Sequence, residues 1–221
     1  VTEAFNFVDP VVENYDGSMK LLWEGAALAV LVVFLFLRDW RATLVSATAL
    51  PLSVIPAFWI MDLMGFSINV VTLLSLSLVV GILVDDAIVE IENIVRHLRM
   101  GKSPLDAARD AADEIGLAVI ATSFTLIAVF LPTAFMSGVP GKFFVQFGWT
   151  AAIAVFWSLV VARMLTPMMA AYLLKVPKKD HGEASWLKHY MRVVQWCLRH
   201  RWTTILVTVV FSVLALAPVF L

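Results

Sequence analysis

The chain has 221 residues, of which 61% are hydrophobic and only 15% charged, and its mean hydropathy is +0.90. This balance excludes an ordinary soluble domain, and six helical crossings of about 20 residues each would leave no room for a large soluble catalytic domain. The net charge of −1 provides no basic surplus for nucleic acid, and the single cysteine, Cys197, excludes a disulfide framework.

Six long runs have almost no charged residues, and they predict six transmembrane helices. Their apolar residues are continuous rather than alternating, which is typical of helices and not of barrel strands. The fold class that we expect is therefore an all-α membrane protein. The six predicted spans are residues 21–37, 42–61, 63–84, 115–141, 143–162 and 202–221.

Lysine and arginine are unevenly shared among the connections, and this asymmetry predicts the orientation. They gather after the first, third and fifth spans, so we expect those connections to be cytoplasmic. Residues 1–20, 62–69 and 136–142 are expected on the opposite side, which would be the periplasmic side in a bacterium.

The domain organisation that follows has four parts. We expect a periplasmic lead-in at 1–20, a five-helix bundle at 21–175, a cytoplasmic linker at 176–200 and a sixth transmembrane helix at 201–221. The chain begins without Met and ends inside an apolar run, so the sixth helix is expected to be truncated and the chain to be a piece of a longer protein.

Two cytoplasmic connections show helical patterns of their own. Ser103 followed by Pro104 predicts the N-cap and first position of a short helix that runs towards the fourth span. Apolar residues at helical spacing predict an amphipathic helix on the inner membrane face, with a soluble linker helix as the alternative. The apolar residues are Trp186, Tyr190, Val193, Val194 and Cys197, and the basic ones are Lys188, Arg192 and Arg199.

Two adjacent carboxylates, Asp85 and Asp86, lie inside the third span. Asp86 is ten residues from Arg96, which is about 15 Å along a helix and about half the hydrocarbon thickness. One Asp at that depth costs roughly 2.5–3.5 kcal/mol, and two ionised neighbours would repel each other. Either the pair binds protons or a cation from another helix compensates it, and alternation between those states would make a proton relay.

Small and polar residues form two adjoining stripes around this pair. We expect both stripes to face the bundle interior, with Gly81 allowing close approach of another backbone. The alternative is that the acids only hold helices together. The first stripe is Ser77, Gly81, Asp85 and Glu92, and the second is Asp86, Glu90 and Asn93.

Arg163 is the one basic residue within the apolar length of a span. A lone guanidinium there must reach the cytoplasm or find a partner. We predict a contact with Glu92 or Glu90 rather than with the Asp pair, and the alternative is contact with headgroups or helix-end carbonyls.

The run from Gly81 to Ile94, with its paired Asp and the Glu92–Asn93 step, resembles the fourth-helix motif of resistance-nodulation-division (RND) transporters of the hydrophobe and multidrug efflux type. The runs 101–108, 119–132 and 165–168 agree with this resemblance, which covers nearly the whole chain.

The resemblance implies part of a twelve-helix bundle in the bacterial inner membrane, with these spans as helices two to seven. It implies drug/proton antiport with Asp85 and Asp86 as the proton relay. From the spacing and depth arguments above, we expect Gly81, Glu92, Asn93 and Arg163 to support this pair. The resemblance also implies a homotrimer that exports small hydrophobic compounds with a periplasmic adaptor and an outer-membrane channel. The later helices, whose Lys, Arg and hydroxyl groups partner the Asp pair in the family, do not match any part of this sequence.

Three other functions compete with this interpretation. An intramembrane aspartyl protease is disfavoured because its two Asp residues lie on different spans. A passive helical scaffold or channel subunit would not depend on titration of the Asp pair. An RND relative that exports lipid or protein also remains open. We expect no metal site, since His97, His181, His189 and His200 lie in cytoplasmic connections rather than on a shared transmembrane face. No phosphate-binding glycine loop is present to support coupling to ATP. As a secondary transporter, the protein is expected to have no enzyme activity and no cofactor other than the coupling proton.

Overall fold

The computed structural model describes residues 8–175 and 185–220, and these residues form helices and contain no strand. The expected all-α membrane fold is confirmed. The chain divides into two compact units, Val1–Pro177 and Lys178–Leu221. The helices of the first unit are α1 (Val8–Leu37), α2 (Trp40–Leu63), α3 (Val70–Arg99), α4 (Pro104–Phe130), η1 (Leu131–Phe135), α5 (Gly138–Val160), η2 (Val161–Leu165) and α6 (Thr166–Leu173).

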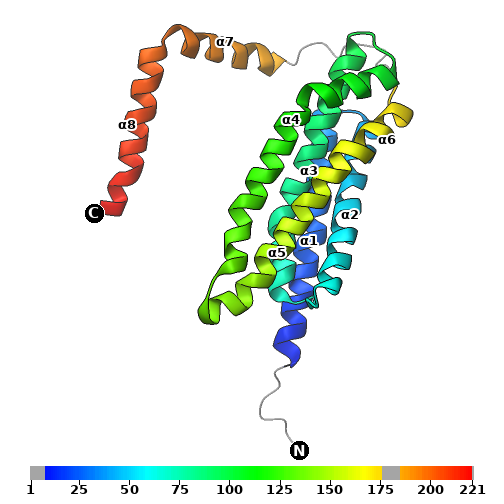
Figure 1. The fold of residues 1–221 in the computed structure, drawn as a ribbon. Coiled ribbons are helices and arrows are strands. Elements are labelled where there is room, and N and C mark those ends of the chain that lie inside the picture. The colour runs from blue at the N-terminus through cyan, green and yellow to red at the C-terminus, as the bar shows by residue number, and fades with distance from the viewer. Residues whose placement is uncertain (1–7, 176–184, 221) are drawn as a thin grey trace, which may run out of the picture. The chain divides into compact units, whose positions relative to one another are not determined.

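Helix α3 is the centre of the first unit. It packs against α1, α2, α4, α5 and α6, and Figure 1 shows these helices side by side as one bundle. Leu73, Leu76, Val79 and Leu83 on α3 are almost completely buried. The helix that carries the paired carboxylates is therefore in contact with most of the other helices of the unit.

The start of α3 is set by Asn69. Its Oδ1 accepts hydrogen bonds from the backbone N–H groups of Val71 and Thr72, and the Thr72 hydroxyl accepts one from the Asn69 N–H. This capping box satisfies N–H groups that a helix start leaves free. Asn69 Nδ2 also donates to Oε1 of Gln146 on α5 over 2.6 Å. The third predicted span, 63–84, therefore begins seven residues later and continues well past the carboxylates to Arg99.

Helix α4 is continuous from Pro104 to Phe130, so the predicted short cytoplasmic helix is wrong as a separate element. The predicted cap is confirmed, because Ser103 Oγ accepts a hydrogen bond from the Asp106 N–H over 3.2 Å. Asp113, Glu114 and Gly116, which precede or begin the predicted fourth span, lie inside this helix and do not end it.

The fifth predicted span is a succession of α5, η2 and α6 rather than one helix ending at residue 162. Pro167 has no N–H for the Arg163 carbonyl, and the Thr166 N–H instead binds the Val161 carbonyl, five residues back. The result is the π-helical turn η2, which lies between α5 and α6 within the fifth span. Such turns are frequent at functional sites, and this one carries Arg163.

Five described helical segments are long and apolar enough to cross a membrane. They correspond to the first five predicted spans. Helices α7 (Ser185–Arg199) and α8 (Arg201–Phe220) of the second unit give a sixth if they are counted together, with a bend of 97° between them. The five segments are Val12–Leu37, Trp40–Leu63, Val70–Arg99, Pro104–Phe135 and Gly138–Leu173.

Helix α7 covers the predicted amphipathic segment. Val194 and Cys197 are partly buried, whereas Arg192 and Gln195 are exposed. The side chains of Trp186 and Lys188 lie outside the described residues, as do residues 1–7 of the predicted lead-in and residues 176–184 of the predicted linker. The near-perpendicular bend into α8 suits a helix lying along a membrane surface before a crossing helix, and the interfacial location stays a prediction.

Candidate functional site

Asp86 is buried between α3 and α4, where only 9% of it is exposed. Ser123 of α4 lies on the facing side, and its Oγ is 3.1 Å from Oδ2 of Asp86 and 2.9 Å from the Val119 carbonyl. A hydroxyl has one proton to donate, so Ser123 can donate to either acceptor but not to both at once. The Ser123 hydroxyl can therefore either donate to the Asp86 carboxylate or turn to the Val119 carbonyl.

Asp85 has a different environment, although it is the next residue in the chain. It is exposed on the surface of the described unit, and so are Gly81 and Glu92 of the same stripe. The expectation that both stripes face the interior is therefore correct for Asp86, Glu90 and Asn93 and wrong for Gly81, Asp85 and Glu92, while Ser77 of the same stripe is partly buried. Adjacent residues on a helix point about 100° apart, and only one of the two directions meets α4.

Gly81 does not make the close backbone contact that its sequence position suggested. Within the described part of the chain, a Cβ added to Gly81 would meet no atom within 4 Å. Asp85 and Gly81 thus share an uncovered face of α3.

Glu90 lies one helical turn beyond Asp86, and none of its side chain is exposed. Its Oε2 is 3.4 Å from Nη1 of Arg163, so the predicted contact between Arg163 and Glu90 is confirmed. Nη1 of Arg163 also donates to the Ala112 carbonyl of α4 over 2.6 Å. The other oxygen of Glu90, Oε1, is buried and has no hydrogen-bond partner among the described residues.

Gly116 makes room for the guanidinium of Arg163. A Cβ at Gly116 would lie 2.5 Å from Nη2 of Arg163, which is closer than Cβ atoms come to non-bonded atoms in proteins. Gly116, Ala112 and Arg163 therefore join α4 to η2 at the level of Glu90, and three helical segments meet around one buried ion pair.

A second polar cluster joins α3 to α4 at the end of α3. His97 is buried, and its Nε2 is 2.8 Å from Oε2 of Glu114 while its Nδ1 is 2.8 Å from Nζ of Lys102. An ammonium group can only donate, so Nδ1 accepts and Nε2–H donates to Glu114. Glu114 also pairs with Arg96, and Lys102 pairs with Asp110 over 2.7 Å.

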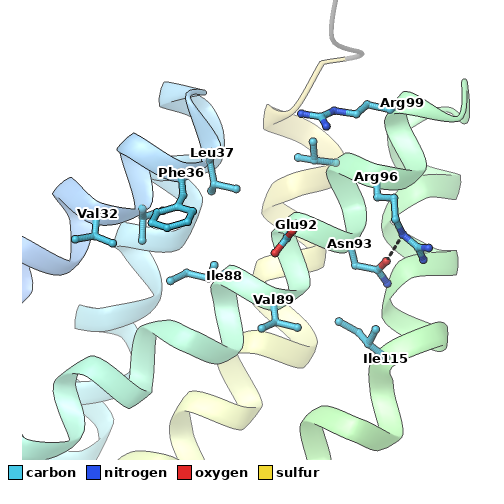
Figure 2. A pocket seen from close by; sticks show the side chains of 12 residues that line it. Val32, Phe36, Leu37, Ile88, Val89, Glu92, Asn93, Arg96, Arg99 and Ile115 are labelled. Carbon is cyan, nitrogen blue, oxygen red and sulfur yellow. Dashed lines mark hydrogen bonds between the residues drawn. The ribbon is translucent and has the colours of Figure 1, made fainter. Parts of the chain in front are cut away.

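A cleft of about 810 Å³ opens between α1, α3 and α4. Its walls are mostly apolar, with Val32 and Phe36 from α1 and Ile88 from α3. Figure 2 shows Glu92 beside this apolar wall, and it shows Asn93 and Arg96 joined by a hydrogen bond of 2.9 Å on the side toward α4. Glu92 and Asn93 therefore lie in different environments, Glu92 beside the apolar wall and Asn93 toward α4, although both were expected to support the Asp pair.

Two residues of this region were not singled out by the sequence. Ser123 falls on a buried stripe with Gly116 and Val119, a spacing of three and four residues that could have indicated the face toward α3. His97 was assigned to a connection, but it belongs to α3 and is buried. The helix pattern of the third span ends in charged residues, and hydrophobicity alone could not reveal that the helix continues.

The described residues contain no group of three or more His, Cys, Asp or Glu side chains that could hold a metal ion. The site offers instead carboxylates, a guanidinium and hydroxyl groups inside a helical bundle. Of these groups, the carboxylates can bind and release protons when their surroundings change, while the guanidinium and the hydroxyl groups act as hydrogen-bond partners.

The chain is similar to known multidrug resistance proteins. It is 43% identical over 192 residues to multidrug resistance protein MdtC of Pectobacterium atrosepticum. The aligned region covers 82% of this chain and 19% of that protein. Identity to MdtC of Salmonella arizonae is 45% over 196 residues, covering 85% and 19% of the two chains. The chain thus spans about a fifth of the length of these relatives. The model of the AcrB/AcrD/AcrF family matches residues 4–220. Because this match includes the paired carboxylates and nearly every helix described above, the chain belongs to the AcrB/AcrD/AcrF family of RND transporters.

Proposed function

We propose that the chain is the N-terminal membrane part of a proton-driven multidrug efflux transporter in the bacterial inner membrane, with Asp85 and Asp86 as its proton carriers. The observation that carries this proposal is the burial of Asp86 inside a span, with the Ser123 hydroxyl as its side-chain partner. The relatives named multidrug resistance proteins support the class of substrate.

The hydrogen bonds of Ser123 suit both charge states of Asp86. When Asp86 is ionised, the Ser123 hydroxyl donates to its Oδ2. When Asp86 is protonated, its own O–H can donate to Ser123 Oγ, and Ser123 can then donate to the Val119 carbonyl. Neither state leaves a buried donor or acceptor without a partner, so the charge can change at a low cost in hydrogen bonding.

Asp85 takes the complementary role in this proposal. Its exposure on the described unit leaves it open to a cation from further helices of the same transporter. Because the chain spans about a fifth of its relatives, the proposal includes a remaining half, assembly as a homotrimer, a periplasmic adaptor and an outer-membrane channel. The transporter moves small hydrophobic compounds and is not an enzyme.

The test compares carboxylate variants of the transporter that contains this chain. Inverted membrane vesicles loaded with a pH-sensitive dye report proton release when a hydrophobic drug is added. Asp85→Asn and Asp86→Asn should abolish drug-dependent proton movement at unchanged membrane levels, because Asn cannot bind the proton. Asp62→Asn, an exposed carboxylate at the other end of the bundle, is the matched control and should retain activity. Wild-type proton movement in either of the first two variants would refute the relay role of that residue, whereas a passive scaffold would show no drug-dependent proton movement even without substitution.

A further inference from the structure

The buried face of α3 has a second carboxylate that the Asp pair does not account for. Four polar side chains follow this face at intervals of four, three and four residues, and all are buried. Glu90 is the most completely enclosed of them, about 6 Å along the helix from Asp86. The four residues are Asp86, Glu90, Asn93 and His97.

The position of Glu90 relative to Asp86 suits an exchange of protons. Side chains four residues apart on a helix lie on the same side, with Cβ atoms about 5–6 Å apart. Two carboxyl groups on such neighbours can meet directly or through one bridging water molecule. The orientation expected from the basic residues puts Glu90 on the cytoplasmic side of Asp86.

The partners of Glu90 leave one of its oxygens free. Oε2 makes a long contact of 3.4 Å with Arg163, while Oε1 is buried without a hydrogen-bond partner in the described residues. An ionised carboxylate normally accepts several hydrogen bonds. The unpartnered Oε1 is therefore an oxygen at which a proton, or a water molecule that delivers one, is accommodated.

Arg163 does not depend on Glu90 for a partner. Its shorter hydrogen bond, 2.6 Å, goes to the Ala112 carbonyl, and Gly116 supplies the space for its guanidinium. If Glu90 became neutral, Arg163 would keep this bond and its partial exposure of 24%. The ion pair can thus open without leaving a buried cation alone.

Few other charges act on Glu90. On α4, Asp113 and Glu114 follow Ala112 and are exposed, with Glu114 paired to Arg96 and His97. Helix α6 has no charged residue, and Arg41 of α2 donates to the Leu173 carbonyl. Among the described residues, Arg163 is therefore the charged group in contact with Glu90, and Asp86 is the carboxylate one helical turn away on the same face.

We propose that Glu90 is a third proton-binding carboxylate, which receives at Oε1 the proton released by Asp86 while Arg163 stays charged against the Ala112 carbonyl. The O–H bond of Asp86 breaks, an O–H bond forms at Glu90, and Asp86 is left as a carboxylate that accepts the Ser123 hydroxyl. Beyond Glu90 the buried face continues to Asn93 and His97, and His97 contacts the exposed Glu114. This inference rests on the proposed transport function and adds a step to it.

Infrared difference spectroscopy tests the proton on Glu90 directly. The transporter is labelled with glutamate carrying ¹³C in its side-chain carboxyl, which separates Glu from Asp bands. A ¹³C-shifted band of a protonated carboxyl should appear within the pH range of transport, disappear in Glu90→Gln, and persist in the control Asp113→Asn. Glu90→Asp keeps a carboxylate and should move the band to the unlabelled position, so the assignment does not depend on the folding of Glu90→Gln alone.

Transport by a double variant separates a proton carrier from a fixed ion pair. Glu90→Gln should reduce drug-coupled proton movement at least tenfold, and Glu90→Gln combined with Arg163→Gln should remain as low because the carboxylate is still missing. A merely structural pair would instead allow the neutral double variant to recover. Recovery, or absence of the Glu90 band, overturns this inference. Loss of transport in Asp86→Asn alongside either result would leave the proposed function standing, whereas retained transport in Asp86→Asn would refute that function itself.

Discussion

The hydroxyl of Ser123 on α4 lies 3.1 Å from Oδ2 of Asp86 on α3, and no other side chain in the described part of the chain donates a hydrogen bond to that carboxylate. Ser123 is itself completely buried. The contact joins two helices at the buried member of the Asp pair. It makes Ser123 a positioning residue for the proposed relay.

Replacement of Ser123 by Ala should therefore impair transport more than folding. A hydrogen bond to a charged group is worth about 1.5–3 kcal/mol, which corresponds to a tenfold or greater change in the proton-binding equilibrium. We expect the pH profile of drug-coupled proton movement to shift and its maximum to fall. Thr125→Val removes an exposed hydroxyl from the same helix and should not change the profile. An unchanged profile in Ser123→Ala would mean that the contact does not influence Asp86.

Gly116→Ala should destabilise the bundle. The added Cβ would lie 2.5 Å from Nη2 of Arg163, so the guanidinium has to move away from Glu90 and Ala112. The end of the Arg163 side chain can move, but the movement breaks its contacts with Glu90 and Ala112, so we expect a loss near the lower end of the about 1–3 kcal/mol typical of overpacking, partly offset by the higher helix propensity of Ala. Gly25→Ala, where a Cβ meets no atom within 4 Å among the described residues, should be neutral or slightly stabilising. Thermal unfolding in detergent, followed by circular dichroism, measures both variants, and equal melting temperatures would contradict the steric argument.

The pair of Glu90 and Arg163 should show energetic coupling in a double-mutant cycle. Removal of one member of a buried pair typically costs about 3–5 kcal/mol, because the other charge is left without compensation. Because Arg163 is partly exposed, Glu90→Gln should lower the free energy of unfolding by an amount near or below the lower figure. Arg163→Met should cost more because it leaves the enclosed Glu90 carboxylate without a cation. We expect the two free-energy changes to be non-additive when unfolding by denaturant is measured. Additive changes would show that the 3.4 Å contact contributes nothing to stability.

The predicted orientation can be tested by cysteine labelling in a Cys197→Ser background. Ser67 is exposed in the connection between α2 and α3, and Asp113 is exposed near the opposite end of the bundle. A membrane-impermeant maleimide should modify Ser67→Cys only from the periplasmic side and Asp113→Cys only from the cytoplasmic side. The reverse result would invert the orientation and also the direction assigned to the step from Asp86 to Glu90.

Helix α7 should lie at the membrane surface with Val194 toward lipid and Gln195 toward water. Its strong amphipathic character and the 97° bend before α8 are the reasons for this expectation. Spin labels at the two positions should differ in collision rates, with oxygen favoured at residue 194 and a water-soluble nickel complex favoured at residue 195. Equal accessibility would indicate a solvated linker helix.

Much of the architecture could be predicted from hydrophobicity alone. The five described spans correspond to uncharged runs because a helix in lipid must be apolar over about 20 residues. The ends of the helices were less predictable. Continuation of α3 to Arg99 and of α4 from Pro104 depends on packing of charged and small residues against neighbouring helices, which hydrophobicity does not report.

The candidate site divides in the same way. Helical rise converts residue numbers into depth, so the sequence by itself determined that Asp85 and Asp86 lie within a span. The same reasoning indicated that Arg163, on another span, needs a partner at the level of Glu90 or Glu92. Only the tertiary structure decided that Asp86 and not Asp85 meets Ser123, and that Arg163 reaches Glu90 and the Ala112 carbonyl rather than Glu92. Depth follows from position along one helix, but the choice of partner depends on the rotation of each helix about its axis, and that rotation is set by the side chains that pack between helices.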